Sequence, residues 1–288
     1  MTSKNIFAQK DSVAKVILLI QNQNMPADVR VKQALETIDR AIANPESAKD
    51  AYAWYIRGYV YKEWYKTFES QNKKSKTRID AVTYLKKSLE LDTAKEFSPN
   101  TKQTLKYLGA TFYNDASAML DPTNYHTAIE DYEKFKECFL LAEPNYNLKI
   151  REIEFKKALA TVYEKIFRSD NKANLQYFGM TEELYKQVIV LDTNNWAGNY
   201  NLAMLYYNYG VDVINAMDVS SDIIVIENIQ DQAKELFKKA LPYALKSYAL
   251  DPKRKEVLIA LQGIYFSLYE FDKSDEFKAK VELLDKEK

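Results

Sequence analysis

The stretch AYAWYIRGYVY (residues 51–61) decides the fold, together with DAVTYLKKSLELDT (residues 80–93), which follows a polar interruption. In both segments large and small apolar residues recur at the spacing of one helix face. Small residues that face large ones let two antiparallel helices approach closely and interlock. The two segments therefore predict a helical hairpin, with one set of side chains turned toward the other: Trp54, Gly58 and Tyr61 toward Ala81, Leu85 and Ser88.

This hairpin resembles one tetratricopeptide repeat, a helix–turn–helix of ~34 residues with the pattern Trp-x2-Leu-Gly-x2-Tyr, then Ala-x3-Phe, then Pro. Four positions match that pattern: Trp54, Gly58, Tyr61 and Ala81. Three depart from it, with other residues in place of Leu, Phe and Pro: Arg57, Leu85 and Thr93. The resemblance implies an all-α protein, a right-handed α-solenoid (superhelix) of about six antiparallel hairpins.

The same pattern returns along the chain, with Gly109, Ala160 and Ala203 at the position of Gly58. The intervals exceed ~34 residues, which indicates insertions within the copies. Three insertions are expected, at residues 67–77, 168–179 and 218–227. We cannot assign the apolar run 223–226 to an element, and Pro242 is expected to kink or break the helix that contains it.

The pattern predicts one continuous solenoid over residues 1–288. A degenerate N-terminal hairpin would occupy residues 6–45, built from helices at 11–22 and 28–43. Four divergent repeats would follow over 50–252. A capping hairpin at 253–288 would close the stack, with helices at 254–270 and 272–286.

Composition excludes several classes of function. The formal net charge of +0 gives no general attraction to nucleic acid or to an anionic membrane, and no apolar run reaches the ~20 residues of a membrane span. The sequence contains no Gly-rich phosphate loop, HExxH or CxxC motif. We therefore expect no bound metal, no cofactor and no enzymatic activity.

One His and one Cys are the remaining candidates for chemistry. His126 follows a turn at Pro122 and is interpreted as a polar residue at a helix start, the alternative being a general base or a pH switch. Cys138 lies on the same expected helix about three turns away, so the pair would not converge. We expect Cys138 to be a small buried residue.

The N-terminal residues Asn5-Ile6-Phe7-Ala8-Gln9-Lys10 are similar to the end of a bacterial signal sequence whose apolar part is missing. As given, the sequence predicts a cytoplasmic protein. The alternative is an exported or periplasmic protein whose N-terminus has been shortened.

The resemblance places the binding surface on the concave side, along the first helix of each hairpin. The groove residues that it implies are rich in Tyr, which suits protein contacts because its ring is rigid and amphipathic. They are Tyr52, Tyr55, Tyr59, Lys106, Tyr113, Lys157, Tyr200, Met204, Tyr207 and Phe266. The other interpretation of these tyrosines is packing between helices.

One sub-family grips C-terminal carboxylates with Lys and Asn, but Tyr55, Tyr59, Glu154 and Ala158 stand at those positions. That ligand class is not expected. The basic run Lys73–Arg78 lacks interleaved aromatic residues, so a solvated loop is expected rather than an RNA contact. The function that follows is a scaffold or adaptor that binds a protein or peptide partner. The alternative is a structural self-assembly module that forms a homo-oligomer.

Overall fold

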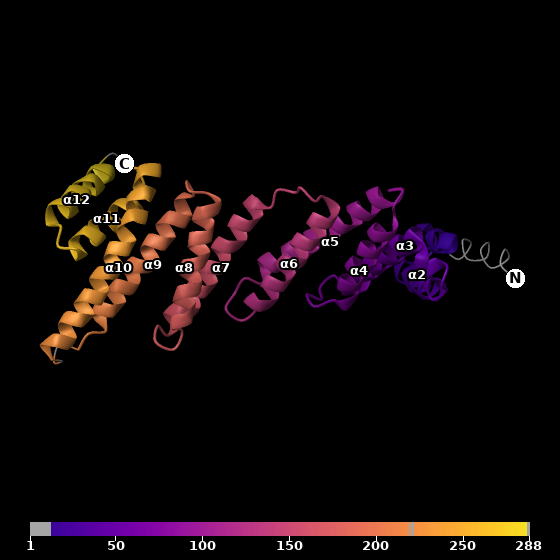
Figure 1. The fold of residues 1–288 in the computed structure, drawn as a ribbon, viewed down its shortest axis with the longest axis horizontal. Helices are drawn as coiled ribbons and strands as arrows, with labels where there is room; N and C mark the ends of the chain where they lie inside the picture. Colours follow the sequence, from indigo (N-terminus) through magenta and orange to yellow (C-terminus); the bar gives the residue numbers. More distant parts are fainter. Residues whose placement is uncertain (1–12, 219, 221, 287–288) are drawn as a thin grey trace. The chain divides into compact units, whose positions relative to one another are not determined.

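The computed structural model describes residues 13–218, 220 and 222–286, and within these ranges every extended regular element is a helix (Figure 1). Residues 13–21 are helical and are followed by eleven labelled α-helices, as the sequence predicts for an all-α protein. The labelled helices are α2 (Ala27–Ile42), α3 (Ala51–Trp64), α4 (Lys76–Leu91), α5 (Ser98–Ala118), α6 (Tyr125–Ala142), α7 (Lys149–Ser169), α8 (Leu175–Leu191), α9 (Trp196–Asn215), α10 (Ile223–Leu250), α11 (Lys255–Ser267) and α12 (Phe271–Lys286). The signal-like residues Asn5–Lys10 lie outside the described part.

The helices form two compact units, with α2–α6 in the first and α7–α12 in the second. Within each unit consecutive helices pack side by side: α3 on α4 and α5 on α6 in the first, α7 on α8, α9 on α10 and α11 on α12 in the second. Each unit is therefore a stack of antiparallel hairpins, the architecture of an α-solenoid. One continuous solenoid over residues 1–288 stays a prediction.

The first helices of neighbouring hairpins also touch, α3 against α5 and α9 against α11. In the first unit Val16, Ile38 and Ile56 belong to one buried core, which joins residues 13–21 and α2 to α3. In the second unit Tyr185, Leu205 and others share a second core that runs through α8–α12. This stacking leaves a row of first helices along each unit, where a groove can form.

The small residues of the pattern lie where helices come closest. A Cβ on Gly58 would stand 2.6 Å from Cγ of Leu85 and 3.2 Å from the carbonyl oxygen of Ala81. A Cβ on Gly109 would stand 2.9 Å from Cβ of Cys138. The predicted contact of Gly58 with the face of Ala81 and Leu85 is thus confirmed, and the second hairpin repeats it.

Arg57, which departs from the repeat pattern, links three helices of the first unit. Its Nε donates to Oδ1 of Asp39 on α2 at 2.9 Å, and its guanidinium lies 4.0 Å over the ring of Tyr84 on α4. The same carboxylate accepts from the hydroxyl of Tyr61 at 2.9 Å. A polar side chain therefore replaces the usual apolar contact without leaving its charge unpaired.

The structure assigns the run 223–226 to a helix, and it shows no break at Pro242. The run 223–226 forms the first turn of α10, whose N-cap Asp222 accepts from the backbone N–H of Ile224 at 2.8 Å. The helix continues through Pro242, and residues on both sides of it, such as Phe237 and Ala244, are buried. In the expected insertion 168–179, residues from Leu175 onward belong to α8.

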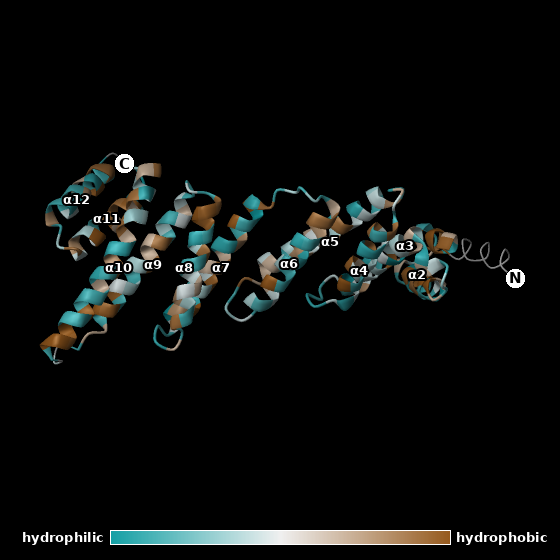
Figure 2. Cartoon of the chain, viewed as in Figure 1, coloured by the Kyte–Doolittle hydropathy of each residue, from teal (hydrophilic) through white to brown (hydrophobic). Residues whose placement is uncertain are grey.

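Apolar residues also reach the surface at the free end of α10, which is brown in Figure 2. Ile223 and Ile224 are each 64% exposed there, and Val225 is 46% exposed. Within the described ranges, every helix is too short or too polar to cross a lipid bilayer.

Candidate functional site

A hollow of about 620 Å³ lies between α9 and α11 in the second unit. Three of its residues come from one face of α9, at i, i+4 and i+7: Tyr200, Met204 and Tyr207. Three come from a face of α11 with the same spacing: Ile259, Gly263 and Phe266. Because residues at this spacing share one helix face, the two rows form opposite walls. We call this hollow the α9–α11 groove; its other lining residues are Glu256, Ala260, Gln262 and Ser274.

The walls of the α9–α11 groove are open to solvent although they are apolar. Phe266 is 62% exposed and Ile259 is 49% exposed. Tyr200 is held by an aromatic stack, since its ring lies 4.9 Å from that of Trp196 at an interplanar angle of 13°. The guanidinium of Arg254 covers Trp196 at 3.9 Å. The groove therefore offers exposed apolar surface on a wall that its own helices hold in place.

A second hollow, of about 310 Å³, lies between α3 and α5 in the first unit. Tyr55 and Tyr59 form its α3 wall, and Tyr107, 41% exposed, lies on the α5 wall. The ammonium of Lys62 sits 3.9 Å from the centroid of the Tyr59 ring and is paired with Glu63. We call this the α3–α5 groove; its remaining lining residues are Asn100, Gln103 and Thr104.

The structure brings six of the ten predicted groove residues into these two hollows: Tyr200, Met204, Tyr207 and Phe266 in one, Tyr55 and Tyr59 in the other. The other four lie elsewhere. Tyr52 packs on Phe97 at 4.7 Å, and Lys106 pairs with Glu143. The ring of Tyr113 lies 4.9 Å from that of Phe135 on α6, and Lys157 is half-buried on α7.

Sequence reasoning missed Tyr107 because it assigned the groove face of α5 to Lys106 and Tyr113. In the structure Leu105, Leu108 and Phe112 are buried, so the side chain at 107 faces the groove instead of the one at 106. One residue is ~100° around a helix, and such an error moves a side chain to a neighbouring face. Tyr107 lies four residues after Gln103, so the two share a helix face, and this spacing was the sequence signal that could have placed Tyr107 in the groove.

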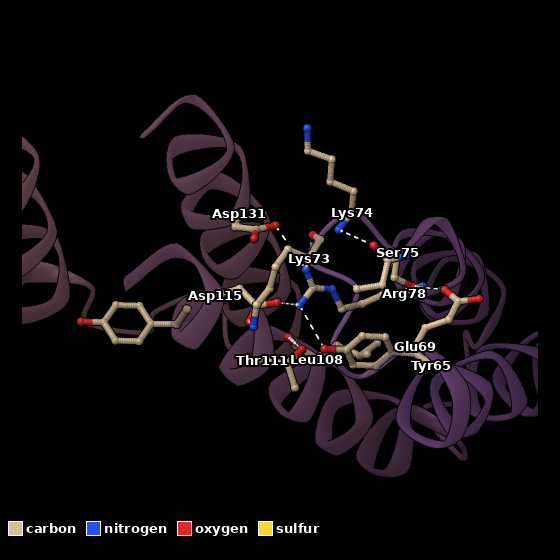
Figure 3. Close-up of polar contacts among 12 residues, drawn as sticks. Tyr65, Glu69, Lys73, Lys74, Ser75, Arg78, Leu108, Thr111, Asp115 and Asp131 are labelled. Carbon is tan, nitrogen blue, oxygen red and sulfur yellow. Dashed lines mark hydrogen bonds and ion pairs between the residues drawn. The ribbon is translucent and has the colours of Figure 1, made fainter. Parts of the chain in front are cut away.

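The expected solvated loop at Lys73–Arg78 is wrong for most of its residues. Ser75 and Arg78 are each 1% exposed, and residues from Lys76 onward belong to α4. Figure 3 shows the contacts of Arg78. Its Nη1 donates to Asp115 Oδ2 at 2.6 Å and to the Tyr65 hydroxyl at 3.2 Å. Its Nη2 donates to the backbone oxygen of Lys73 at 3.1 Å and to Asp131 Oδ1 at 3.3 Å. Arg78 thus joins the insertion to α5 and α6 in the first unit.

Other residues of this insertion are also fixed. Glu69 accepts hydrogen bonds from the indole of Trp64 at 3.0 Å and from the hydroxyl of Ser75 at 2.6 Å. The ammonium of Lys73 lies 2.6 Å from Asp115 Oδ1. The insertion is therefore an ordered part of the first unit. The basic composition of this segment alone did not predict that order.

Burial raises the pKa of Asp131 to about 6, against the opposing effect of Arg78, and the neighbouring charge of Asp115 adds to the rise. Oδ2 of Asp131 is buried with no hydrogen-bond partner among the described residues. Because the cluster holds Arg78, Lys73 and two carboxylates, it is close to neutral when all four are charged. We interpret it as a structural anchor.

His126 and Cys138 lie on α6 as predicted and do not converge. His126 is exposed, and its ring lies 4.0 Å from that of Tyr125. Cys138 is fully buried, and this burial raises the pKa of its thiol to about 12. The thiol is therefore protonated at neutral pH, which disfavours it as a nucleophile.

No family model matches the chain, and no curated protein matches it. Among solved structures, it is similar to "MamA protein" with 17% identity over 80% of this chain and 92% of that one, at a TM-score of 0.34. It is similar to the S. pombe nuclear import adaptor Nro1 with 12% identity over 97% of this chain and 94% of that one, at a TM-score of 0.36. A second Nro1 structure, described as a hypoxic regulator of sterol synthesis and a nuclear import adaptor, has 13% identity over 98% and 89% of the two chains, at a TM-score of 0.35.

Proposed function

We propose that this chain is a tetratricopeptide-type repeat protein that binds a protein partner in the α9–α11 groove. One observation carries the proposal: two helix faces, far apart in the sequence, line one open hollow with exposed aromatic and aliphatic side chains. The α3–α5 groove offers Tyr55, Tyr59 and Tyr107 as a second contact surface in the first unit.

Exposed apolar side chains that share one concave surface are unusual on a monomer and mark sites of interaction. Burying Phe266 and Ile259 under a partner would remove apolar area from water, at roughly 25 cal/mol per Å². Tyr200 and Tyr207 add rigid rings whose hydroxyls can form hydrogen bonds at little cost in side-chain entropy. A groove of this composition favours a peptide segment over a small charged metabolite.

The close approach at Gly58 and Gly109 supports the repeat type, since the tetratricopeptide pattern places a small residue at this contact. We also propose that the protein acts without catalysis. His126 is exposed, and the thiol of Cys138 is buried and held protonated.

Selection from a library of displayed random peptides tests the groove. Peptides should be enriched on the wild-type protein and lost on the double variant Ile259→Ala and Phe266→Ala, which should fold because both side chains are largely exposed. Val190→Ala is the matched control, since Val190 is 81% exposed on α8 and lies outside the groove. Equal enrichment on wild type and double variant would refute the proposal.

A second candidate function is self-assembly, which the exposed first turn of α10 favours. Ile223 and Ile224 form a small apolar surface that a second copy could cover. Light scattering at two protein concentrations separates the candidates, because the average molar mass of a self-assembling protein rises with concentration. The variant Ile223→Glu should prevent this rise. A strict monomer at both concentrations removes this candidate.

A further inference from the structure

The α9–α11 groove carries one charged side chain among its lining residues, Glu256. This residue is exposed in the first turn of α11 and forms no ion pair within the part of the chain that the structure describes. Three cations precede it in the sequence. Arg254 Nε lies 2.9 Å from Asp251 and Lys255 Nζ lies 2.6 Å from Asp285, whereas Lys253 is exposed and lines, with Glu256, an adjacent hollow outside the α9–α11 groove. A carboxylate is therefore available at one end of an otherwise uncharged groove.

Glu256 lies next to an aromatic wall. Tyr200 and Glu256 line the same hollow, where burial raises the pKa of Tyr200 and the negative charge of Glu256 raises it further. Trp196, which stacks on Tyr200 but does not line the groove, already carries a cation of this chain, because the guanidinium of Arg254 covers its ring. A carboxylate beside aromatic rings is a favourable environment for an ammonium or guanidinium group.

The rest of the groove is apolar. Met204 on α9 faces Ile259 and Phe266 on α11, and no other charge lines this part among the described residues. An acidic partner segment would meet Glu256 and find no lining cation to compensate it. Charge complementarity therefore favours a basic partner over an acidic one.

We propose, on the basis of the function proposed above, that the α9–α11 groove selects a partner segment in which a Lys or Arg side chain adjoins large apolar side chains. The cation pairs with Glu256 beside Tyr200, and the apolar side chains lie over Met204, Ile259 and Phe266.

Three end-capped peptides of the form Ser-Gly-Leu-X-Phe-Gly-Ser, with X as Lys, Gln or Glu, test this selection. Binding is followed by NMR through the methyl signal of Met204, which the variant Met204→Leu identifies. We expect the Lys peptide to bind about fivefold more tightly than the Gln peptide, as for a partly exposed ion pair with an aromatic neighbour, and the Glu peptide to bind most weakly. Raising the salt concentration should reduce this preference.

Glu256→Gln should make the affinities of the Lys and Gln peptides equal, and Glu256→Lys should reverse the order of the Lys and Glu peptides. Glu282→Gln is the control, an exposed acid on α12 outside the groove, and should leave the order unchanged. Equal affinities for all three peptides on the wild type would refute the charge selection while the groove itself stands as a binding site. The absence of any Met204 shift would also refute it. Equal enrichment on the wild type and on the Ile259→Ala, Phe266→Ala variant in the display selection would refute the proposed function as well.

Discussion

The hydroxyl oxygen of Tyr207 lies 2.5 Å from the place that a Cβ on residue 263 would occupy, and Gly263 leaves that place empty. The Tyr207 ring also packs 5.7 Å from the ring of Phe237, so its phenol has support on one side and open groove on the other. A glycine in the middle of α11 thus sets how far Tyr207 projects into the α9–α11 groove.

Gly263→Ala should change binding more than stability. A new methyl group must displace the phenol of Tyr207 toward the groove, while the gain in helix propensity of about 1 kcal/mol offsets much of the strain. We expect the free energy of unfolding to change by less than about 1 kcal/mol and the affinity for the Lys peptide to fall severalfold. Thermal unfolding and peptide titration measure the two effects.

Gly179→Ala is the matched control for that variant, since a Cβ at this exposed position of α8 would meet nothing within 4 Å. It should stabilise the protein by up to about 1 kcal/mol and leave peptide affinity unchanged. If Gly263→Ala behaved in the same way as Gly179→Ala, the contact with Tyr207 would have no role in the groove.

Gly109→Ala should destabilise the first unit by about 1–3 kcal/mol. The new Cβ would stand 2.7 Å from the Phe139 ring and 2.9 Å from Cβ of Cys138, an atom that cannot move unless α6 moves with it. Urea unfolding measures the loss. If the variant had the same free energy of unfolding as the wild type, α5 and α6 could move apart without loss of stability. That result would contradict close packing at this contact.

Arg78→Met should destabilise the protein by about 3–5 kcal/mol, because it leaves two buried carboxylates without their shared cation. Asp115 would retain Lys73, whereas Asp131 would lose its charged partner. Adding Asp115→Asn and Asp131→Asn to this variant should recover part of the loss. A single variant within 1 kcal/mol of wild type in urea unfolding would contradict the anchor role.

The pH dependence of stability should report on Asp131. Its pKa is raised to about 6 in the folded protein from an ordinary value of 3.8, so its ionised form costs stability at neutral pH. As the pH falls from 7.5 to 5.5, the folded state takes up a proton that the unfolded state does not yet bind, and stability should rise by about 1 kcal/mol. Urea unfolding at the two pH values should show this rise in the wild type.

Asp131→Asn is the comparison for this pH effect, because Asn does not titrate. The rise in stability between pH 7.5 and 5.5 should be largely absent from this variant. An identical rise in both proteins would assign the effect to a group other than Asp131.

Periodicity and residue size were enough to predict the hairpins and the helix faces that pack. Tyr200, Met204, Tyr207 and Phe266 were assigned to a groove because each lies opposite a buried face of its own helix. The same reasoning failed on α5, where a shift of one residue separates Lys106 from Tyr107. Residues one position apart lie on adjacent faces of a helix, and the packing of neighbouring helices determines which of these faces lines the groove.

By itself the sequence determined that the chain forms helices with one apolar side each, and that small residues such as Gly58 and Gly109 mark their closest contacts. The reason is local, since spacing and side-chain volume act within one hairpin. Only the tertiary structure decided that Arg78 is buried between carboxylates 37 and 53 residues away, and that Gly263 makes room for Tyr207. Those outcomes depend on which charged and aromatic side chains from distant segments pack together in the folded protein. The spacing of residues along the chain does not specify these long-range contacts.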